Sequence, residues 1–163
     1  MRLTQWTDYS LRMLMFCALH QERPRAPTVG EIAEAHGISR SHLTKIAMTL
    51  AAAGLLETTR GRGGGLRLLK PAEQIRVGDV LRMTETDFKQ VECFDDEHNS
   101  CRITHFCQLK GALSEAMEAY LAVLDACSVA DLVKPAAPRQ APVRIVSMPV
   151  SLLADRPEAM SPA

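Results

Sequence analysis

Three of the chain's five cysteines lie within fifteen residues, in the segment CFDDEHNSCRITHFC. Cys93, Cys101 and Cys107 follow the spacing C-x7-C-x5-C, and the residues between them are mostly polar or charged. Cysteines that serve only as small apolar packing residues belong in a core rather than in such a segment. Because thiolates bind zinc and iron, the pattern indicates a metal or iron–sulfur site that lacks a fourth ligand.

The residue types leave several occupants of this site open. Zinc would need a fourth nitrogen or sulfur ligand, which His98 or His105 could supply, but the short C-x2-4-C spacing of tight zinc sites is absent. An iron–sulfur cluster tolerates longer loops and one weaker ligand. A polar loop without metal, with both histidines at its surface, is the third interpretation.

A structural disulfide among these cysteines is disfavoured. The strongest apolar run near the start, residues 11–19, is too short for a membrane span and lacks the features of a secretory signal. We therefore expect a cytoplasmic protein whose thiols stay reduced.

Charge is distributed unevenly along a chain whose net charge is zero. Residues 1–82 carry twelve Lys or Arg and seven Asp or Glu, whereas residues 83–134 carry four and ten. This asymmetry predicts a local basic surface for a polyanion in the first half and a different role for the acidic half.

The basic half has the pattern of a helix-turn-helix. A first helix over residues 4–20, capped by Thr7 or Asp8, would bury Cys17. A capping box of Thr28 and Glu31 opens a short helix that ends at Gly37. Ser39 can cap the next helix, over residues 40–53, whose polar face near its start would read the major groove. The residues of that face are Ser39, Arg40, Ser41, His42, Thr44 and Lys45. A helical hairpin with a solvated face is the alternative.

The next residues predict a wing. Two short strands, 55–60 and 66–69, flank a glycine-rich loop at 61–65. Arg60 and Arg62, with Arg67 as a further candidate, could reach phosphates or a narrow minor groove. A nucleotide-binding loop is disfavoured, because Gly-Lys-Ser/Thr is missing and the glycines lead into a strand. With no nucleophile and base constellation either, we expect no enzymatic activity.

The fold class expected is mainly α with a small β wing: a winged helix-turn-helix domain plus a long dimerisation helix. Apolar residues from Leu109 to Leu124 recur at helical spacing, and Cys127 continues that face as an expected buried residue. DNA readers of this kind usually bind two half-sites as symmetric dimers. The predicted organisation is a DNA-binding domain (1–82), a cluster-binding loop (83–108), a dimerisation helix with C-terminal cap (109–134) and a proline-rich disordered tail (135–163).

The sequence resembles the winged-helix iron–sulfur transcriptional repressors over residues 1 to about 134. The likeness is carried by TDYSLRMLMFCA, SRSHLTKI and RGRGGGLRLLKPA, followed by the three-cysteine segment and a long helix. The resemblance implies a homodimeric repressor that binds a palindromic operator on double-stranded DNA and senses through an iron–sulfur cluster.

Within this group the sequence is most similar to the nitric-oxide-sensing, NsrR-type members. IscR-type members complete a 2Fe–2S cluster with a histidine where this chain has Lys110, and a protonated lysine cannot be a ligand. NsrR-type members donate an aspartate of the first helix to the other subunit, and Asp8 in TDYSLR matches it. From the residues alone, Asp8 would be a first-turn carboxylate favoured by the helix dipole.

The resemblance therefore implies a 4Fe–4S cluster held by Cys93, Cys101 and Cys107 and by Asp8 of the other subunit, with nitric oxide as the signal. The spacing C-x7-C matches the iron-sensing, RirA-type members better, which keeps an iron-responsive regulator open. A 2Fe–2S cluster or zinc is the alternative cofactor, and a zinc-stabilised DNA-binding protein is the corresponding alternative function.

Overall fold

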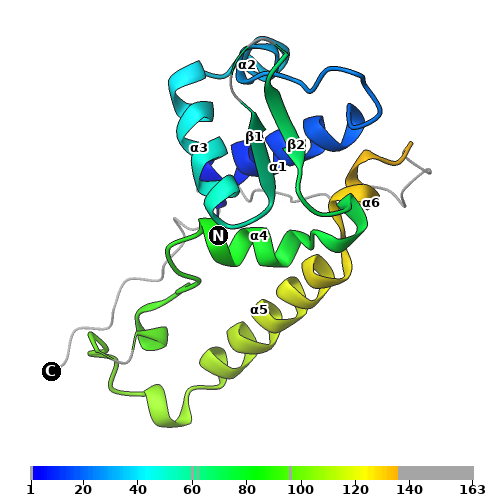
Figure 1. The fold of residues 1–163 in the computed structure, drawn as a ribbon. Coiled ribbons are helices and arrows are strands. Elements are labelled where there is room, and N and C mark those ends of the chain that lie inside the picture. The colour runs from blue at the N-terminus through cyan, green and yellow to red at the C-terminus, as the bar shows by residue number, and fades with distance from the viewer. Residues whose placement is uncertain (1, 60, 62, 96, 136–163) are drawn as a thin grey trace, which may run out of the picture.

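The computed structural model describes residues 2–59, 61, 63–95 and 97–135. This part of the chain is mainly helical, with one two-stranded antiparallel sheet (Figure 1). The α-helices are α1 (Gln5–Leu19), α2 (Val29–His36), α3 (Arg40–Ala52), α4 (Val77–Thr84), α5 (Gln108–Ala126) and α6 (Val129–Val133). The strands are β1 (Leu56–Thr59) and β2 (Gly65–Leu68), and three short 3-10 helices are η1 (Ala72–Gln74), η2 (Glu92–Phe94) and η3 (Thr104–Phe106). The predicted mainly α fold with a small β wing is confirmed.

The helix-turn-helix forms through the local signals that predict it. Thr28 Oγ1 accepts from the Glu31 backbone N–H at 3.2 Å, and the Glu31 carboxylate accepts from the Thr28 backbone N–H at 2.6 Å. Gly37 ends α2 with a φ of 64°, a left-handed conformation that glycine adopts without a steric penalty. Ser39 stands at the N-cap of α3, but its hydroxyl pairs with that of Ser41 instead of capping the helix.

The wing packs against the loop that joins α1 and α2. The Leu66 backbone N–H donates to the Pro27 carbonyl at 2.8 Å. A Cβ atom on Gly65 would lie 2.6 Å from the Ala26 carbonyl oxygen, so this position requires glycine. The Arg67 guanidinium donates to three backbone carbonyls of the loop, at residues 21, 23 and 24. Arg67 therefore anchors this loop, and its phosphate contact stays a prediction.

Helix α1 supplies the centre of the core. Met13, Leu14 and Cys17 are buried in a cluster with apolar residues of α2, α3, α4 and α6. Cys17 is 1% exposed, as expected of a packing residue. The expected N-cap was wrong: Thr4 caps α1 by accepting from the Thr7 backbone N–H, and the Thr7 side chain is fully buried.

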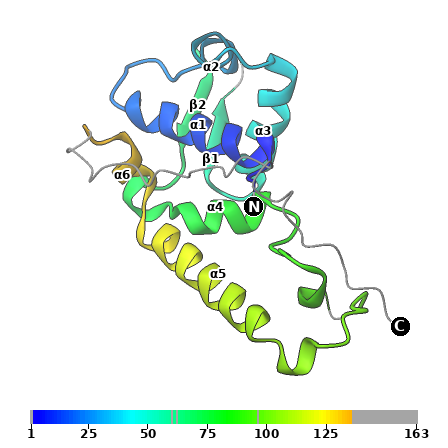
Figure 2. The ribbon, with the colours of Figure 1, turned by 180° about the vertical axis from the view of Figure 1, so that it is seen from behind.

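Helix α5 slants away from the winged-helix domain, below α4 in both views (Figures 1 and 2). The segment 85–107 runs from the end of α4 to the start of α5, and its described residues, all but residue 96, contain two 3-10 turns and no longer helix or strand. Every residue of α5 is partly or fully exposed. The helix ends at Ala126, so Cys127 is a half-buried residue after the helix and not part of its apolar face.

After α5 the chain returns to the winged-helix domain. Ser128 and Asp131 form a capping box that starts α6. The Val129 backbone N–H donates to the Ile75 carbonyl, and the Val77 backbone N–H donates to the Cys127 carbonyl, both at 2.9 Å. These bonds fix the far end of α5 to the start of α4. Among the described helices, none is both long enough and apolar enough to cross a membrane. The predicted tail lies outside the described residues from residue 136 onward.

Candidate DNA-binding surface and cysteine segment

Helix α3 turns a polar face to solvent. Its buried residues are Leu43, Ile46, Ala47 and Leu50, which pack into the core. The six predicted DNA contacts are all exposed: Ser39, Arg40, Ser41, His42, Thr44 and Lys45. Exposed polar and basic side chains at the start of a second helix have the arrangement by which a recognition helix contacts base edges.

Contacts from neighbouring helices orient this face. The Tyr9 ring of α1 meets the His42 ring edge-on, with the ring centroids 6.1 Å apart. The Arg40 guanidinium lies beside Gly30 of α2, where an added Cβ would be 3.5 Å from Arg40 Cζ. The position of the face therefore depends on how α1 and α2 pack against α3.

A groove of about 520 Å³ separates α3 from the wing. The hydroxyl-bearing residues that line it are Thr28, Thr44, Thr58 and Thr59, and Met48 of α3, 68% exposed, also faces it. No sequence pattern singles out Met48, Thr58 and Thr59, because only the folded wing shows that they line a groove between it and α3. Arg60 and Arg62 lie outside the described residues, so their DNA contacts stay predictions.

The three clustered cysteines differ in exposure. Cys93, in η2, is 8% exposed, whereas Cys101 and Cys107 are half-buried, and Cys107 directly precedes α5. All five cysteines of the chain are free thiols. Asn99 Oδ1 accepts from the Cys101 backbone N–H at 3.0 Å, and the Thr104 hydroxyl donates to the Cys101 carbonyl at 2.8 Å. Local bonds of this kind hold the loop around Cys101.

Three free thiols are the donor set of an iron–sulfur or zinc site. Within the described part of the single chain, however, no group of three or more His, Cys, Asp or Glu side chains could hold a metal ion. His98 and His105 are exposed as expected, and His98 Nδ1 lies 3.3 Å from the Asp95 carboxylate. The thiols therefore fit a cluster by their chemistry, but the segment must close before all three can bind one group.

Asp8 faces solvent from the first turns of α1. Its carboxylate is bonded to Arg12 one turn later, at 2.9 Å to Nε and 2.8 Å to Nη2. This hydrogen bond raises the pKa of the Arg12 guanidinium. Both side chains line a surface hollow of about 690 Å³ with Tyr9, His36 and Ile38. The hollow lies at the turn between α2 and α3 and leaves Asp8 accessible to a second molecule.

Comparisons with known proteins agree with the resemblance described above. The sequence matches the Rrf2 family, described as iron-dependent transcriptional regulators, over residues 3–135. It is 51% identical over 135 residues to the HTH-type transcriptional regulator NsrR of Bacillus subtilis (strain 168), covering 82% of this chain and 91% of that protein. Identity to the regulator of the same name from Shouchella clausii (strain KSM-K16) is 47% over 133 residues, covering 82% and 89%. The structure of T. potens IscR is similar at a TM-score of 0.66 and 26% identity, covering 82% of this chain and 87% of that chain.

Proposed function

The chain belongs to the Rrf2 family of iron-dependent transcriptional regulators, and on this premise we propose that it is a nitric-oxide-responsive repressor that senses through a 4Fe–4S cluster. Membership makes it a DNA-binding transcriptional regulator and not an enzyme, as the sequence predicts. That relatives 51% and 47% identical to the chain are named NsrR supports nitric oxide as the signal.

The observation that carries the proposal is the position of the free thiols. Cys93, Cys101 and Cys107 lie on one segment with little regular structure, between α4 and α5. Cys17 is buried in the core, and Cys127 lies at the far end of α5. The three thiols that could move together are thus the three whose spacing indicates a cluster.

The fourth ligand in this proposal is Asp8 of the partner subunit. Its accessibility beside the hollow near the helix-turn-helix supports this role. When bound, the cluster supplies iron that reacts with nitric oxide. Carboxylate is a harder and weaker ligand for such iron than thiolate, so Asp8 is the ligand given up most easily. Once released, its carboxylate can form the ion pair with Arg12 that the single chain shows.

Helix α5 supports a homodimer. One row of apolar side chains is spaced alternately by three and four residues and is exposed along the whole helix: Leu109, Ala112, Ala116, Ala119, Val123 and Ala126. Leu109 and Val123 are 63% and 69% exposed. This spacing is that of a helix-packing seam, and the alanines allow a second helix to approach closely. The other apolar residues, such as Met117 and Leu121, are half-buried against the chain itself.

A symmetric dimer would present two recognition helices. In this proposal the face from Ser39 to Lys45 reads the major groove in each half-site, and Arg60 and Arg62 reach the minor groove or phosphates. Two-fold symmetry of the protein then requires a palindromic operator.

Anaerobic purification tests the sensing proposal. We expect a brown protein with about four iron and four sulfide per chain, the content of a 4Fe–4S cluster. Stoichiometric nitric oxide should bleach it and release operator DNA. A colourless, sulfide-free protein that contains zinc would overturn the proposal.

An iron-responsive regulator is the second candidate. The C-x7-C spacing and the description of the family as iron-dependent favour it. Loss of the cluster on iron chelation, with a slow response to nitric oxide, would identify iron as the signal.

A further inference from the structure

A group of hydroxyl side chains joins the first turn of α1 to the end of α4. Thr7 and Thr84 are 0% and 8% exposed, and their Oγ1 atoms lie 2.8 Å apart. The Thr84 hydroxyl also lies 2.7 Å from the Val80 carbonyl within α4. Since buried polar groups are costly unless hydrogen-bonded, this pair fixes the position of α1 relative to α4.

Glu85 adds a charged acceptor to this group. It is the residue that ends α4, where its backbone N–H donates to the Leu81 carbonyl at 2.8 Å. Its Oε1 accepts from the Thr4 backbone N–H at 2.9 Å, the Thr4 hydroxyl at 3.2 Å and the Thr7 hydroxyl at 2.5 Å. A carboxylate at a helix N-terminus also interacts favourably with the helix dipole. Glu85 thus caps α1 from a position 81 residues away in the sequence.

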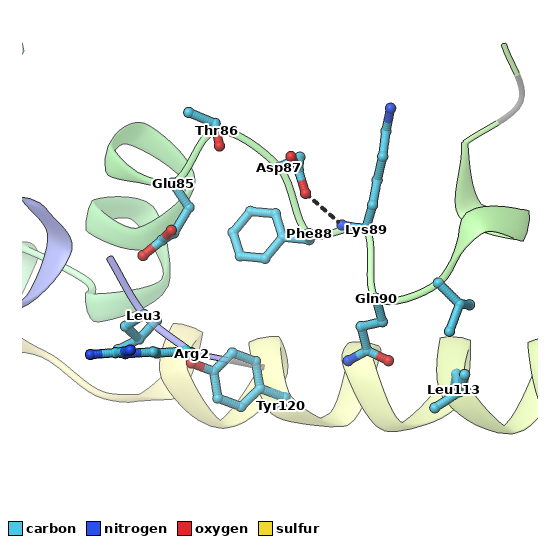
Figure 3. Close-up of a pocket in the computed structure, with 11 residues that line it drawn as sticks. Arg2, Leu3, Glu85, Thr86, Asp87, Phe88, Lys89, Gln90, Leu113 and Tyr120 are labelled. Carbon is cyan, nitrogen blue, oxygen red and sulfur yellow. Dashed lines mark hydrogen bonds between the residues drawn. The ribbon is translucent and has the colours of Figure 1, made fainter. Parts of the chain in front are cut away.

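Glu85 also stands at the root of the cysteine segment. It lines a hollow of about 610 Å³ between the first residues of the chain, the linker after α4 and α5. Figure 3 shows Glu85 pointing from the end of α4 toward Leu3 and Arg2, with Phe88 and Tyr120 facing the same hollow. Desolvation and, secondarily, the charge of Glu85 raise the pKa of Tyr120. A movement of the segment that displaces this linker would therefore alter the contacts of α1.

We propose that Glu85 is a positioning residue that transmits the state of the cysteine segment to α1 and so to the recognition helix. On one side it lies eight residues before Cys93. On the other it holds the turn of α1 that leads into Asp8 and Tyr9, and Tyr9 packs against His42 of α3. The cap is formed while the three thiols are still apart, so closure of the segment around a cluster would move the linker, change the contacts of Glu85 with α1 and thereby shift α3 relative to its DNA-binding position. A signal changes the affinity for DNA only if it favours one of two arrangements of the protein over the other.

This inference rests on the proposed function for its signal, but its contacts can be tested without the cluster. Trp6 is the chain's single tryptophan, and it lies half-buried in the first turn of α1, between Thr4 and Thr7. Its fluorescence and the hydrogen exchange of amides 4–8 report on that turn in the full-length protein without cluster. A residue that served only as a cap would change these signals and the melting temperature without changing the effect of the cluster on DNA binding.

The experiment compares Glu85→Gln and Thr84→Val with the matched control Asp87→Asn. Asp87 is an exposed acid on the same linker, bonded to the backbone of Lys89 (Figure 3). In Glu85→Gln we expect exchange of amides 4–8 to accelerate about tenfold, the size of one hydrogen bond to a charged group. The ratio of operator affinities with and without cluster should fall at least about threefold, while iron and sulfide contents stay at the wild-type level. Thr84→Val should likewise accelerate the exchange and lower the affinity ratio. Asp87→Asn should change neither the exchange nor the ratio.

Unchanged exchange in Glu85→Gln would overturn the cap, and an unchanged affinity ratio in both variants would overturn the transmission. If the wild-type protein itself binds DNA equally with and without cluster, the proposed function fails together with the transmission. The exchange measurement still decides whether Glu85 caps α1. If Glu85→Gln does not fold, both measurements can still be made on Thr84→Val. Valine preserves the side-chain volume at that site, so this variant should fold.

Discussion

Asp8 and Arg12 form an exposed ion pair, with 43% and 45% of their side chains accessible. Pairs this exposed contribute little to stability, because water screens them and both side chains lose freedom. The fold therefore does not depend on Asp8, and its carboxylate can change partners at small cost. Replacing Asp8 can therefore test its role as a cluster ligand without disturbing the fold.

We expect Asp8→Ala to leave the melting temperature within a few degrees of the wild type, since only an exposed pair is lost. The reconstituted cluster should decay faster in air and react differently with nitric oxide, because one ligand is missing. Visible absorption over time measures both effects. The control is Asp79→Ala, which removes another exposed helical carboxylate paired with an arginine. Identical cluster decay in Asp8→Ala and the wild type would exclude Asp8 as the fourth ligand.

The cysteines can be told apart by alkylation followed by mass spectrometry. Burial raises the pKa of the Cys17 thiol to about 12, so at pH 8 it is protonated as well as shielded. We expect Cys17 to react only after unfolding. In the folded protein without cluster, Cys101 and Cys107 should react, and reconstitution should protect them while Cys127 stays reactive. Protection of Cys127 by the cluster would contradict the ligand assignment.

The same thiol makes stability depend on pH in a defined direction. The folded pKa of Cys17 lies above the value near 8.5 of an unfolded thiol. Its neutral form is therefore favoured by folding, and this contribution is fully present below about pH 8.5. It is lost as the pH rises from there toward 12, so denaturant midpoints should fall over that range. Cys17→Ala should flatten this fall.

At the scale of elements, signals within a few residues predicted the fold well. The capping box of Thr28 and Glu31 and the left-handed Gly37 fix α2 in the sequence and in the structure. Contacts between residues far apart in the sequence could not be predicted from local patterns. Glu85 has no local role that predicts its bonds to Thr4 and Thr7, which are 81 and 78 residues away.

The candidate site also has some features that local signals predict and others that depend on distant partners. The recognition face follows from helical periodicity, whereas the groove lining depends on how the wing folds back on α3. The placement of the thiols around a cluster depends on a partner subunit, which no periodicity within one chain describes. The start of α6 is different: Ser128 and Asp131 are three residues apart, and this local signal was missed.

At the scale of elements, the testable prediction concerns the role of helix α5 in dimerisation. Its 19 residues expose an apolar row that a second copy can cover. A charge in the middle of the row, Ala116→Glu, should convert the dimer to a monomer, because the unpaired carboxylate would be desolvated at the seam. Analytical ultracentrifugation measures the change, and operator affinity should fall with it. Glu118→Gln, on an exposed position of the same helix outside the row, should remain dimeric. A dimeric Ala116→Glu protein would place the interface elsewhere.

At the scale of the whole molecule, the basic half and the acidic half of the chain, which have different proposed functions, meet at α1. The basic half carries the helix-turn-helix and wing, and the acidic half carries the cysteines and α5. Helix α1 packs against α3 and α4, which belong mostly to the basic half, and against α6 of the acidic half, so each half contacts it. In a dimer each α1 would also supply Asp8 to the partner. A change in the acidic half can therefore reach both recognition helices through one element.

The basic half should reveal itself in the salt dependence of operator binding. Each phosphate contact releases counterions and contributes about 0.9 to the slope of log K against log salt concentration. Arg62→Ala removes one predicted contact per subunit, so the slope of the dimer should fall by about 1.8. Affinity should weaken similarly for every operator sequence, because phosphates carry no sequence information.

A base contact should behave in the opposite way. Arg40→Ala should relax the preference for one base pair in each half-site, at about 1–3 kcal/mol per contact, with a smaller effect on the slope. Lys134→Ala serves as the control, because this lysine pairs with Asp131 at the end of α6 and lies outside the predicted DNA surface. Fluorescence anisotropy with labelled operators over several salt concentrations measures all three variants. If Arg62→Ala kept the wild-type slope while Lys134→Ala reduced it, the wing would not be the phosphate-contacting element, and the basic surface would have to be sought around α6.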